Sequence, residues 1–575
     1  MYEEQTIPWW KNAIGYQIYP KSFQDTNHDG IGDLNGICQR LPYLKELGID
    51  FVWLNPIYAS PNVDNGYDIS DYQAINPEYG TMAEMVDLIK EAHAHGIKII
   101  MDLVINHTSD QHPWFQEALK GPDNPYHDYY IWADGTQKPN EWESIFGGSI
   151  WQEVPSLKKQ YLHVFAKEQP DLNWENKQMR QDLYKMIRWW LDLGIDGFRI
   201  DAISHIKKSS WDTKPQADWA FSPFTNVAGI DVYLTELGQI FKEYDIVTVG
   251  EASGVTAEQA PEWVGENGYF NMIFEFEHIS LWKREKQDTI DVIALKKALS
   301  HWQKQLDYGK GWNALYMENH DVPRSVSVFG NDQPVYRQKA ATALATMYLL
   351  LQGTPFIYQG QELGMTNMTF TDLDQLDDVT AKQQIEELRK LEDSGERNLE
   401  ILELMSSISR DNSRTPMQWS TEENAGFSTA EPWLVVNPNY EEINVAAQLK
   451  QPNSILSYYK QLIQLRKNRA VFVTGHYHDY LLDDPKVYVY ERFLGTERML
   501  VVVNLTKDAA EIDLPAAISG QSWTLVIDNH SVEGANSEHE LQLTQHQKTM
   551  ALAPYEARVY HMNQRVKETF NEKIR

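Results

Sequence analysis

The chain has 575 residues, 42% hydrophobic and 12% aromatic, which is typical of globular proteins and not of disordered ones. Its 82 acidic residues outnumber 51 basic ones and give a net charge of −31, which disfavours binding to nucleic acid. A chain of this length is expected to form two or three domains. Its single cysteine, Cys38, excludes a disulfide within the chain.

Nothing in the sequence predicts a membrane partner. The longest apolar candidate, residues 341–358, is interrupted by Thr, Gln, Gly and Pro. The first residues, MYEEQTIPWWKN, lack the basic and apolar regions of a secretory signal. We therefore expect a cytoplasmic location.

Eight short apolar runs predict buried β-strands, and amphipathic helices lie between most of them. Strands that alternate with helices form a parallel sheet. Eight such units over about 450 residues fit a (β/α)8 TIM barrel with insertions better than an open sheet. The strands are expected at 16–20, 51–56, 97–104, 197–202, 246–251, 271–276, 313–319 and 355–359, with helices including 36–47, 82–95, 179–193 and 338–351.

Two connections are too long for simple loops. Residues 105–174 predict a subdomain inserted after the third strand, and residues 361–430 a second insertion after the eighth strand, with a helical stretch at 381–402. Short alternating β-runs after about residue 475 predict an all-β C-terminal domain. The expected domains are a catalytic barrel (1–104 and 175–474), the inserted subdomain (105–174) and a C-terminal β-sandwich (475–575), whose last dozen residues form a charged helix or tail.

Charged residues gather at the predicted carboxyl ends of the strands, where barrels of this type hold their active sites. Arg199 and Asp201 are two residues apart in one strand and so point to the same side. Glycoside hydrolysis with retained configuration needs an ionised carboxylate and a protonated one, about 5–5.5 Å apart. Arg199 would keep Asp201 ionised as a nucleophile, and Glu251, at the end of the next strand, suits the general acid. A metal site built on the histidines is the alternative, but no pair has a ligand spacing such as HExxH.

The chain resembles the α-amylase family of glycoside hydrolases over essentially its whole length, and within it the oligo-1,6-glucosidase and α-glucosidase subfamily. Ordered motifs carry the resemblance: DLVINH (102–107), GFRIDAISH (197–205), GEAS (250–253), ENHD (318–321) and the subfamily marker QPDLN (169–173). The resemblance implies that Asp201 is the nucleophile, Glu251 the acid/base and Asp321 the stabiliser of the transition state. It also implies a subsite for the terminal glucose, with Tyr67 as its stacking platform, lined by Asp64, Tyr67, His107, Arg199, His320 and Arg410.

A second motif, DTNHDGIGD at 25–33, alternates oxygen-bearing side chains in a Gly-bent loop, a pattern that suits Ca²⁺. It lacks the twelfth-position Glu of an EF-hand, and the alternative is a polar turn rich in Asx residues. The resemblance implies a structural Ca²⁺, or Mg²⁺, bound by Asp25, Asn27, Asp29, the backbone carbonyl of Ile31, and Asp33.

The bond that is cut is predicted from the residue after the nucleophile. Relatives acting on α-1,6 bonds usually carry Val there and those acting on α-1,4 bonds Ala or Thr; here it is Ala202. The run IDAISHIKK also resembles bacillary exo-α-1,4-glucosidases. We therefore predict exo-acting hydrolysis of maltose and short maltooligosaccharides, with transglucosylation as a second outcome of the same intermediate. An oligo-1,6-glucosidase is the alternative.

Other activities of the fold fit less well. No basic cluster for a phosphate is evident, which disfavours a trehalose-6-phosphate hydrolase, and no Arg/Asp-rich loop of the sucrose-isomerase type follows Phe329. Non-enzymatic transporter subunits with this fold have lost catalytic carboxylates that this chain keeps. The expected partner is thus a small oligosaccharide, and the sequence leaves a monomer or homodimer open.

Overall fold

The computed structural model describes residues 7–282, 290–391, 395–530, 542–544 and 546–563. Its largest sheet contains β1 (Gly15–Ile18), β2 (Phe51–Leu54), β5 (Lys98–Val104), β9 (Gly197–Asp201), β10 (Val247–Glu251), β11 (Met272–Phe274), β12 (Ala314–Leu315) and β13 (Thr354–Tyr358). These strands are parallel and follow the order β11-β10-β9-β5-β2-β1-β13-β12. A parallel bridge between Ile273 and Asn313 joins the two ends of the sheet. The predicted TIM barrel is confirmed, and a strand lies at each predicted position.

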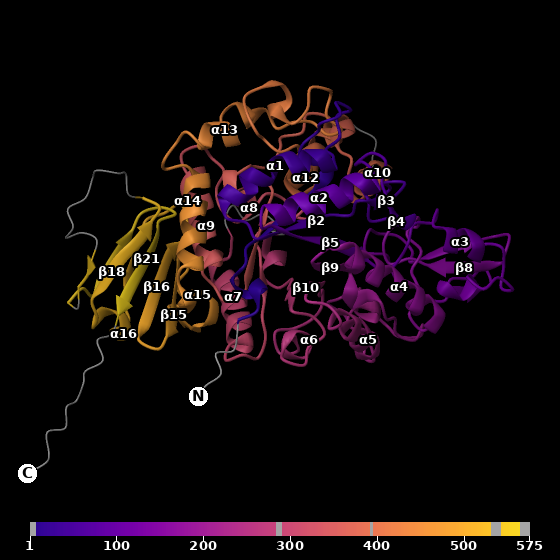
Figure 1. Ribbon diagram of the computed structural model, residues 1–575, viewed down its shortest axis with the longest axis horizontal. Coiled ribbons are helices and arrows are strands. Elements are labelled where there is room, and N and C mark those ends of the chain that lie inside the picture. Colours follow the sequence, from indigo (N-terminus) through magenta and orange to yellow (C-terminus); the bar gives the residue numbers. More distant parts are fainter. Residues whose placement is uncertain (1–6, 283–289, 392–394, 531–541, 545, 564–575) are drawn as a thin grey trace, which may run out of the picture.

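Helices form the outer layer of the barrel (Figure 1). The four predicted helices are present with ends within two residues of those expected, as α1 (Leu34–Leu47), α2 (Met82–Ala94), α4 (Lys177–Leu193) and α9 (Arg337–Leu349). The Asp33 side chain begins α1 by accepting a hydrogen bond from the Gly36 N–H at 2.7 Å. Gly48 ends it at φ 101°, a conformation that glycine adopts without strain. Within the described ranges, no helix is long and apolar enough to cross a membrane.

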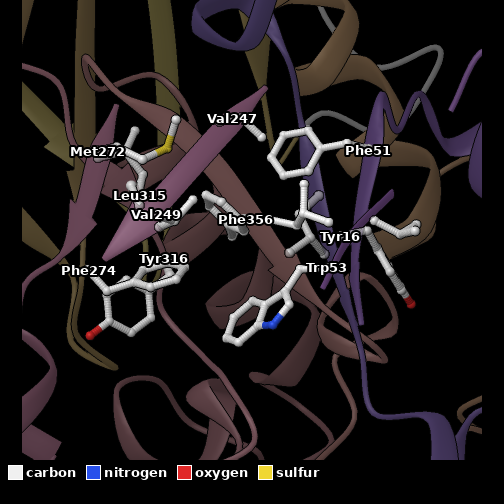
Figure 2. Close-up of a cluster of buried hydrophobic side chains, with 14 of the residues drawn as sticks. Tyr16, Phe51, Trp53, Val247, Val249, Met272, Phe274, Leu315, Tyr316 and Phe356 are labelled. Carbon is white, nitrogen blue, oxygen red and sulfur yellow. The ribbon is translucent and has the colours of Figure 1, made fainter. Parts of the chain in front are cut away.

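Aromatic side chains fill the inside of the barrel (Figure 2). Phe356 packs edge-on against Phe51 and Phe274, with ring centroids 5.3 Å and 4.9 Å apart. Trp53 lies 5.4 Å from Phe274, and its indole N–H donates to Asp102 Oδ2 at 3.1 Å. The packed interior therefore forms a rigid floor directly beneath the polar residues at the carboxyl ends of the strands.

Two insertions rise from the strand ends that carry those polar residues. After β5 the chain forms α3 (Pro113–Ala118) and an antiparallel sheet of β6 (Trp132–Asp134), β8 (Lys159–Leu162) and β7 (Trp151–Val154), with a small apolar core of its own. After β13 it forms α10 (Val379–Leu391) and α11 (Gly395–Ile408), again around a separate core. The single helical stretch predicted at 381–402 is thus two helices.

The chain after the barrel folds as two packed sheets. The larger contains, in order, β14 (His476–Tyr480), β15 (Val487–Leu494), β16 (Glu497–Asn504), β21 (Ala557–Asn563), β18 (Trp523–Asp528) and β19 (Gln542–Leu543), and the smaller β17 (Ala510–Asp513) and β20 (Thr549–Leu552). Alternate residues of β15 face opposite sides. Val487 and Val489 join the core between the sheets, whereas the Tyr490 hydroxyl donates to the Met347 carbonyl of α9 at 3.0 Å.

The C-terminal sheets therefore pack against one side of the barrel, and the subdomain with α3 and β8 lies at the opposite end of the molecule (Figure 1). The all-β C-terminal fold is as predicted. The predicted terminal helix or tail lies outside the described residues.

Candidate active site

Three carboxylates from three neighbouring strands share one guanidinium at the carboxyl end of the barrel. Arg199 Nη1 lies 2.8 Å from Asp102 Oδ1 and 2.6 Å from Asp201 Oδ1, and Arg199 Nη2 lies 2.8 Å from Glu251 Oε1. The guanidinium also lies over the Trp53 ring, 5.0 Å from its centroid. The floor of the barrel thus fixes the arginine, and the arginine holds Asp201 and Glu251 side by side.

The residue after Asp201 has an uncommon backbone conformation. Ala202 adopts φ 45° and ψ 30°, in the left-handed region that residues other than glycine seldom occupy. This turn directs the Ala202 N–H to Glu251 Oε2 at 2.8 Å. The segment that presents Asp201 therefore also positions Glu251, and a β-branched residue in place of Ala202 would be strained.

The residues predicted to hold the terminal glucose surround a buried end of the site. The Tyr67 hydroxyl donates to Asp102 Oδ2 at 2.9 Å and lies 2.7 Å from His320 Nε2, and the two rings are parallel with centroids 5.3 Å apart. Gln169 Nε2, in the QPDLN segment of the inserted subdomain, lies 3.1 Å from His107 Nε2 and donates to an Asp64 carboxylate oxygen at 3.2 Å. The subdomain thus closes this end of the site.

A second arginine, Arg410, connects Asp321 and Asp378 to Asp64 at the same buried end. Arg410 Nη1 lies 3.1 Å from Asp321 Oδ1, and Arg410 Nη2 lies 3.2 Å from Asp64 Oδ1 and 2.5 Å from Asp378 Oδ1. Arg414 Nη2 is also 3.2 Å from Asp321 Oδ1. Sequence reasoning did not include Asp378 or Arg414. Asp378 lies among other aspartates in the second insertion, and Arg414 lies four residues after the predicted subsite residue Arg410 in the segment RDNSRTPMQW (410–419).

Burial has a stronger effect on Asp201 than the neighbouring arginine does. Burial raises the pKa of Asp201 well above its ordinary value, and Arg199 offsets this only in part. Burial likewise raises the pKa of Asp102 to about 6. The expected ionising effect of Arg199 is present but is diluted, because one guanidinium serves three carboxylates.

Asp321 shows the opposite balance. Burial acts to raise its pKa, but the combined charges of His320, Arg410 and Arg414 outweigh burial and lower it. Burial also lowers the pKa of His320 to about 3, so this ring is neutral near pH 7 and the arginines carry the effect there. The charges around Asp321 therefore hold it ionised.

A cavity of about 720 Å³ opens on the other side of the acidic groups, between the loop after β11 and the helices α10 and α11. Glu251, Asp321 and Arg410 line it. Exposure of the side chains rises toward this cavity, from 0% for Asp102 and 10% for Asp201 to 16% for Glu251 and 32% for Asp321. The site thus has one closed end and one open end.

The predicted cation loop is held by hydrogen bonds of its own. Asp25 Oδ1 accepts the N–H groups of Asn27 and His28 at 3.0 Å and 2.8 Å, and Asp29 Oδ1 accepts that of Ile31 at 2.8 Å. Asp33 caps α1. In the described part of the chain, no group of three or more His, Cys, Asp or Glu is arranged to bind a metal. The Asx-rich turn accounts for this geometry, although the oxygens also suit a hard cation, and the cation stays a prediction.

Chelation tests the cation. If Ca²⁺ or Mg²⁺ is bound, EDTA should lower the melting temperature by about 2–4 °C or more, and added Ca²⁺ should restore it. Asp25→Asn should melt at the lower temperature and no longer respond to EDTA. A wild-type protein that does not respond to EDTA would contradict the prediction.

A carboxylate pair on the rim of a (β/α)8 barrel, beside a buried cluster of polar side chains, is typical of the class of TIM-barrel glycoside hydrolases. Comparison with known families gives the particular one. Residues 17–475 match the α-amylase catalytic domain, and residues 481–549 match the C-terminal domain of maltogenic amylase. The chain belongs to the α-amylase family of glycoside hydrolases.

Relatives resemble the chain over nearly its whole length. It is 46% identical to an oligo-1,6-glucosidase of Parageobacillus thermoglucosidasius, across 96% of this chain and 98% of the relative. It is 45% identical to an alpha-glucosidase of Pediococcus pentosaceus, across 97% and 99%. The crystal structure of a trehalose-6-phosphate hydrolase of Bacillus licheniformis matches with a TM-score of 0.89 at 42% identity, across 97% of this chain and all of that one.

Proposed function

We propose that the protein is an exo-acting, retaining α-glucosidase that releases the terminal non-reducing glucose of short oligosaccharides. The closed end of the site is the observation that carries the proposal. Asp64 and His107 are nearly fully buried, and Gln169 joins them. A sugar chain has no path beyond this wall, so one terminal glucose unit lies behind the scissile bond and the rest of the substrate occupies the open cavity.

The contacts assign a role to each acid in this proposal. Asp201 attacks the anomeric carbon of the bound glucose while Glu251 donates a proton to the leaving oxygen. Glu251 then takes a proton from the water that hydrolyses the glucosyl ester on Asp201. Asp321, held ionised by arginines, faces the positive charge that develops on the sugar ring. A sugar hydroxyl that replaces this water would give transglucosylation.

For the bond that is cut, we favour α-1,6. Relatives named oligo-1,6-glucosidase match the chain at 43% to 47% identity over at least 96% of its length. The α-1,4 linkage predicted from Ala202 finds less support, since among the relatives described above only the broader name alpha-glucosidase is compatible with it. Hydrolysis of α-1,4 bonds remains the second candidate because of that alanine.

A side-by-side assay separates the candidates. We expect kcat/KM for isomaltose to exceed that for maltose, sucrose and trehalose-6-phosphate by about tenfold or more. A clear preference for maltose would overturn the α-1,6 assignment and support the Ala202 argument. In that case Ala202→Val should raise the isomaltose-to-maltose ratio by about tenfold, within the range that one small change in a pocket allows.

Asp102→Asn should extend activity toward lower pH. Activity requires ionised Asp201, so kcat/KM falls as the pH drops through the pKa of that carboxyl. Because the charge of Asp102 contributes to raising the pKa of Asp201, a neutral asparagine should lower this pKa and move the acid limb of the profile down. The measurement is kcat/KM for 4-nitrophenyl α-glucoside between about pH 4 and pH 8. A limb that stays in place or moves up would show that the two carboxyls are not coupled.

A further inference from the structure

We propose that the open cavity is built to receive an apolar ring, and that the enzyme transfers glucose to alcohols that carry an aromatic ring. This inference rests on the proposed function and names the class of acceptor for the same site. It concerns the open cavity beyond Glu251, on the side away from the buried end of the site.

The position of the cavity determines what enters it. Glu251 lines the cavity and is the group that exchanges a proton with the leaving oxygen. Since the glucose fills the closed end, the occupant of the cavity is the leaving group in the first half of the reaction. In the second half, an alcohol bound there is the acceptor, because the two steps pass through the same geometry.

Among the described lining residues, charge lies at the catalytic end of the cavity. Among the described residues that line it, the ionisable ones are Glu251, Asp321, Asp378 and Arg410. Arg410 contacts both Asp321 and Asp378, and Glu251 is held by Arg199. The remaining polar groups among these described lining residues are uncharged.

The far walls combine uncharged polar side chains, such as Ser280, Thr380 and Gln384, with apolar ones from two separate elements. The loop after β11 contributes Phe276, Ile279 and Trp282, and the second insertion contributes Ala381, Met405 and Ile408. Phe276, Trp282 and Ile408 are half-buried, so part of each side chain remains open to the cavity, whereas Met405 and Ile279 are buried behind them. An aromatic ring between these walls would bury more apolar surface away from water than a polyol of similar size.

The transfer step balances without a further reactant. The acceptor oxygen forms a bond to the anomeric carbon of the glucosyl ester, and the bond between that carbon and the Asp201 carboxylate breaks. The acceptor proton goes to the Glu251 carboxylate, which regains the form that starts the next cycle. The products are an α-glucoside of the alcohol and free enzyme.

The proposal is tested by measuring how the covalent glucosyl intermediate divides between hydrolysis by water and transfer to an alcohol. With 4-nitrophenyl α-glucoside as donor, nitrophenol release measures total turnover, free glucose measures hydrolysis, and their difference measures transfer. At equal concentrations, benzyl alcohol should capture the intermediate about tenfold better than glycerol, although both offer a primary hydroxyl. Equal capture of the two alcohols would overturn the proposal.

Two variants and a matched control locate the effect. Ile408→Asn and Phe276→Ala should each lower the ratio of benzyl alcohol to glycerol capture about threefold or more. Leu404→Asn makes the same change as the first variant on the same helix, but at a residue 44% exposed that does not line the cavity, and should leave the ratio unchanged. Ratios that are unchanged in both cavity variants would overturn the assignment of the walls. A wild-type protein that releases no nitrophenol would overturn the proposed function itself, and this inference with it.

Discussion

Asp201→Asn is expected to abolish glucose release from every α-glucoside, with kcat falling by at least about 10⁴-fold. Asparagine fills the same space, but its amide does not form the covalent ester through which the proposed reaction passes. Glucose release by the purified variant and the wild type, measured by a coupled assay on isomaltose, checks the expectation.

The folded state of this variant should be unharmed. Folding buries Asp201 where its ionised form is disfavoured, and it shares Arg199 with two other carboxylates. A neutral asparagine removes that cost, so the melting temperature should stay equal or rise, the usual trade between stability and activity at a catalytic site. Asp374→Asn, at an exposed aspartate, is the matched control and should keep full activity. Turnover within tenfold of wild type in Asp201→Asn would exclude this residue as the nucleophile.

Glu251→Gln is expected to affect substrates according to their leaving groups. Isomaltose needs a proton on its leaving oxygen, so its hydrolysis should fall by about 10²–10⁴-fold. The nitrophenolate of 4-nitrophenyl α-glucoside leaves without that proton, so its first-turnover release should fall far less. The two oxygens of Glu251 accept from different donors, Oε1 from Arg199 and Oε2 from the Ala202 N–H, so the single carbonyl oxygen of glutamine keeps one of these contacts and its NH2 group leaves the other donor unpaired.

Stopped-flow measurement of nitrophenol release separates formation of the intermediate from its hydrolysis. A rapid burst followed by slow turnover is the expected trace for Glu251→Gln, because its glutamine does not activate water. Equal losses on both substrates would show instead that Glu251 positions the substrate and does not protonate the leaving group.

The periodicity of the sequence was sufficient to predict the barrel. Its strands are short apolar runs that end in polar residues, and this pattern survives because each strand is buried on both faces. The alternation of residue types likewise predicted the strand β15, whose valines and tyrosines pack into different cores. The prediction for the second insertion was less accurate, since a continuous helical pattern over 381–402 does not show that the chain forms two helices.

The sequence did not predict most contacts of the site, because they join residues that are far apart in the chain. Spacing placed Arg199 and Asp201 on one face but gave no sign that the arginine also binds Asp102 and Glu251 from adjacent strands. Nor did it show the left-handed turn at Ala202, because alanine has no preference for it. Asp378 approaches Arg410 only through the fold of the second insertion.

The configuration of the first product tests the central claim most directly. Proton NMR during hydrolysis of 4-nitrophenyl α-glucoside, which yields a single glucose per turnover, resolves the two anomers before they equilibrate. Attack by Asp201 followed by water on the same face predicts that α-glucose appears first and β-glucose follows only by mutarotation. β-Glucose as the first product would contradict the account, since it would mean direct attack by water and no covalent intermediate on Asp201.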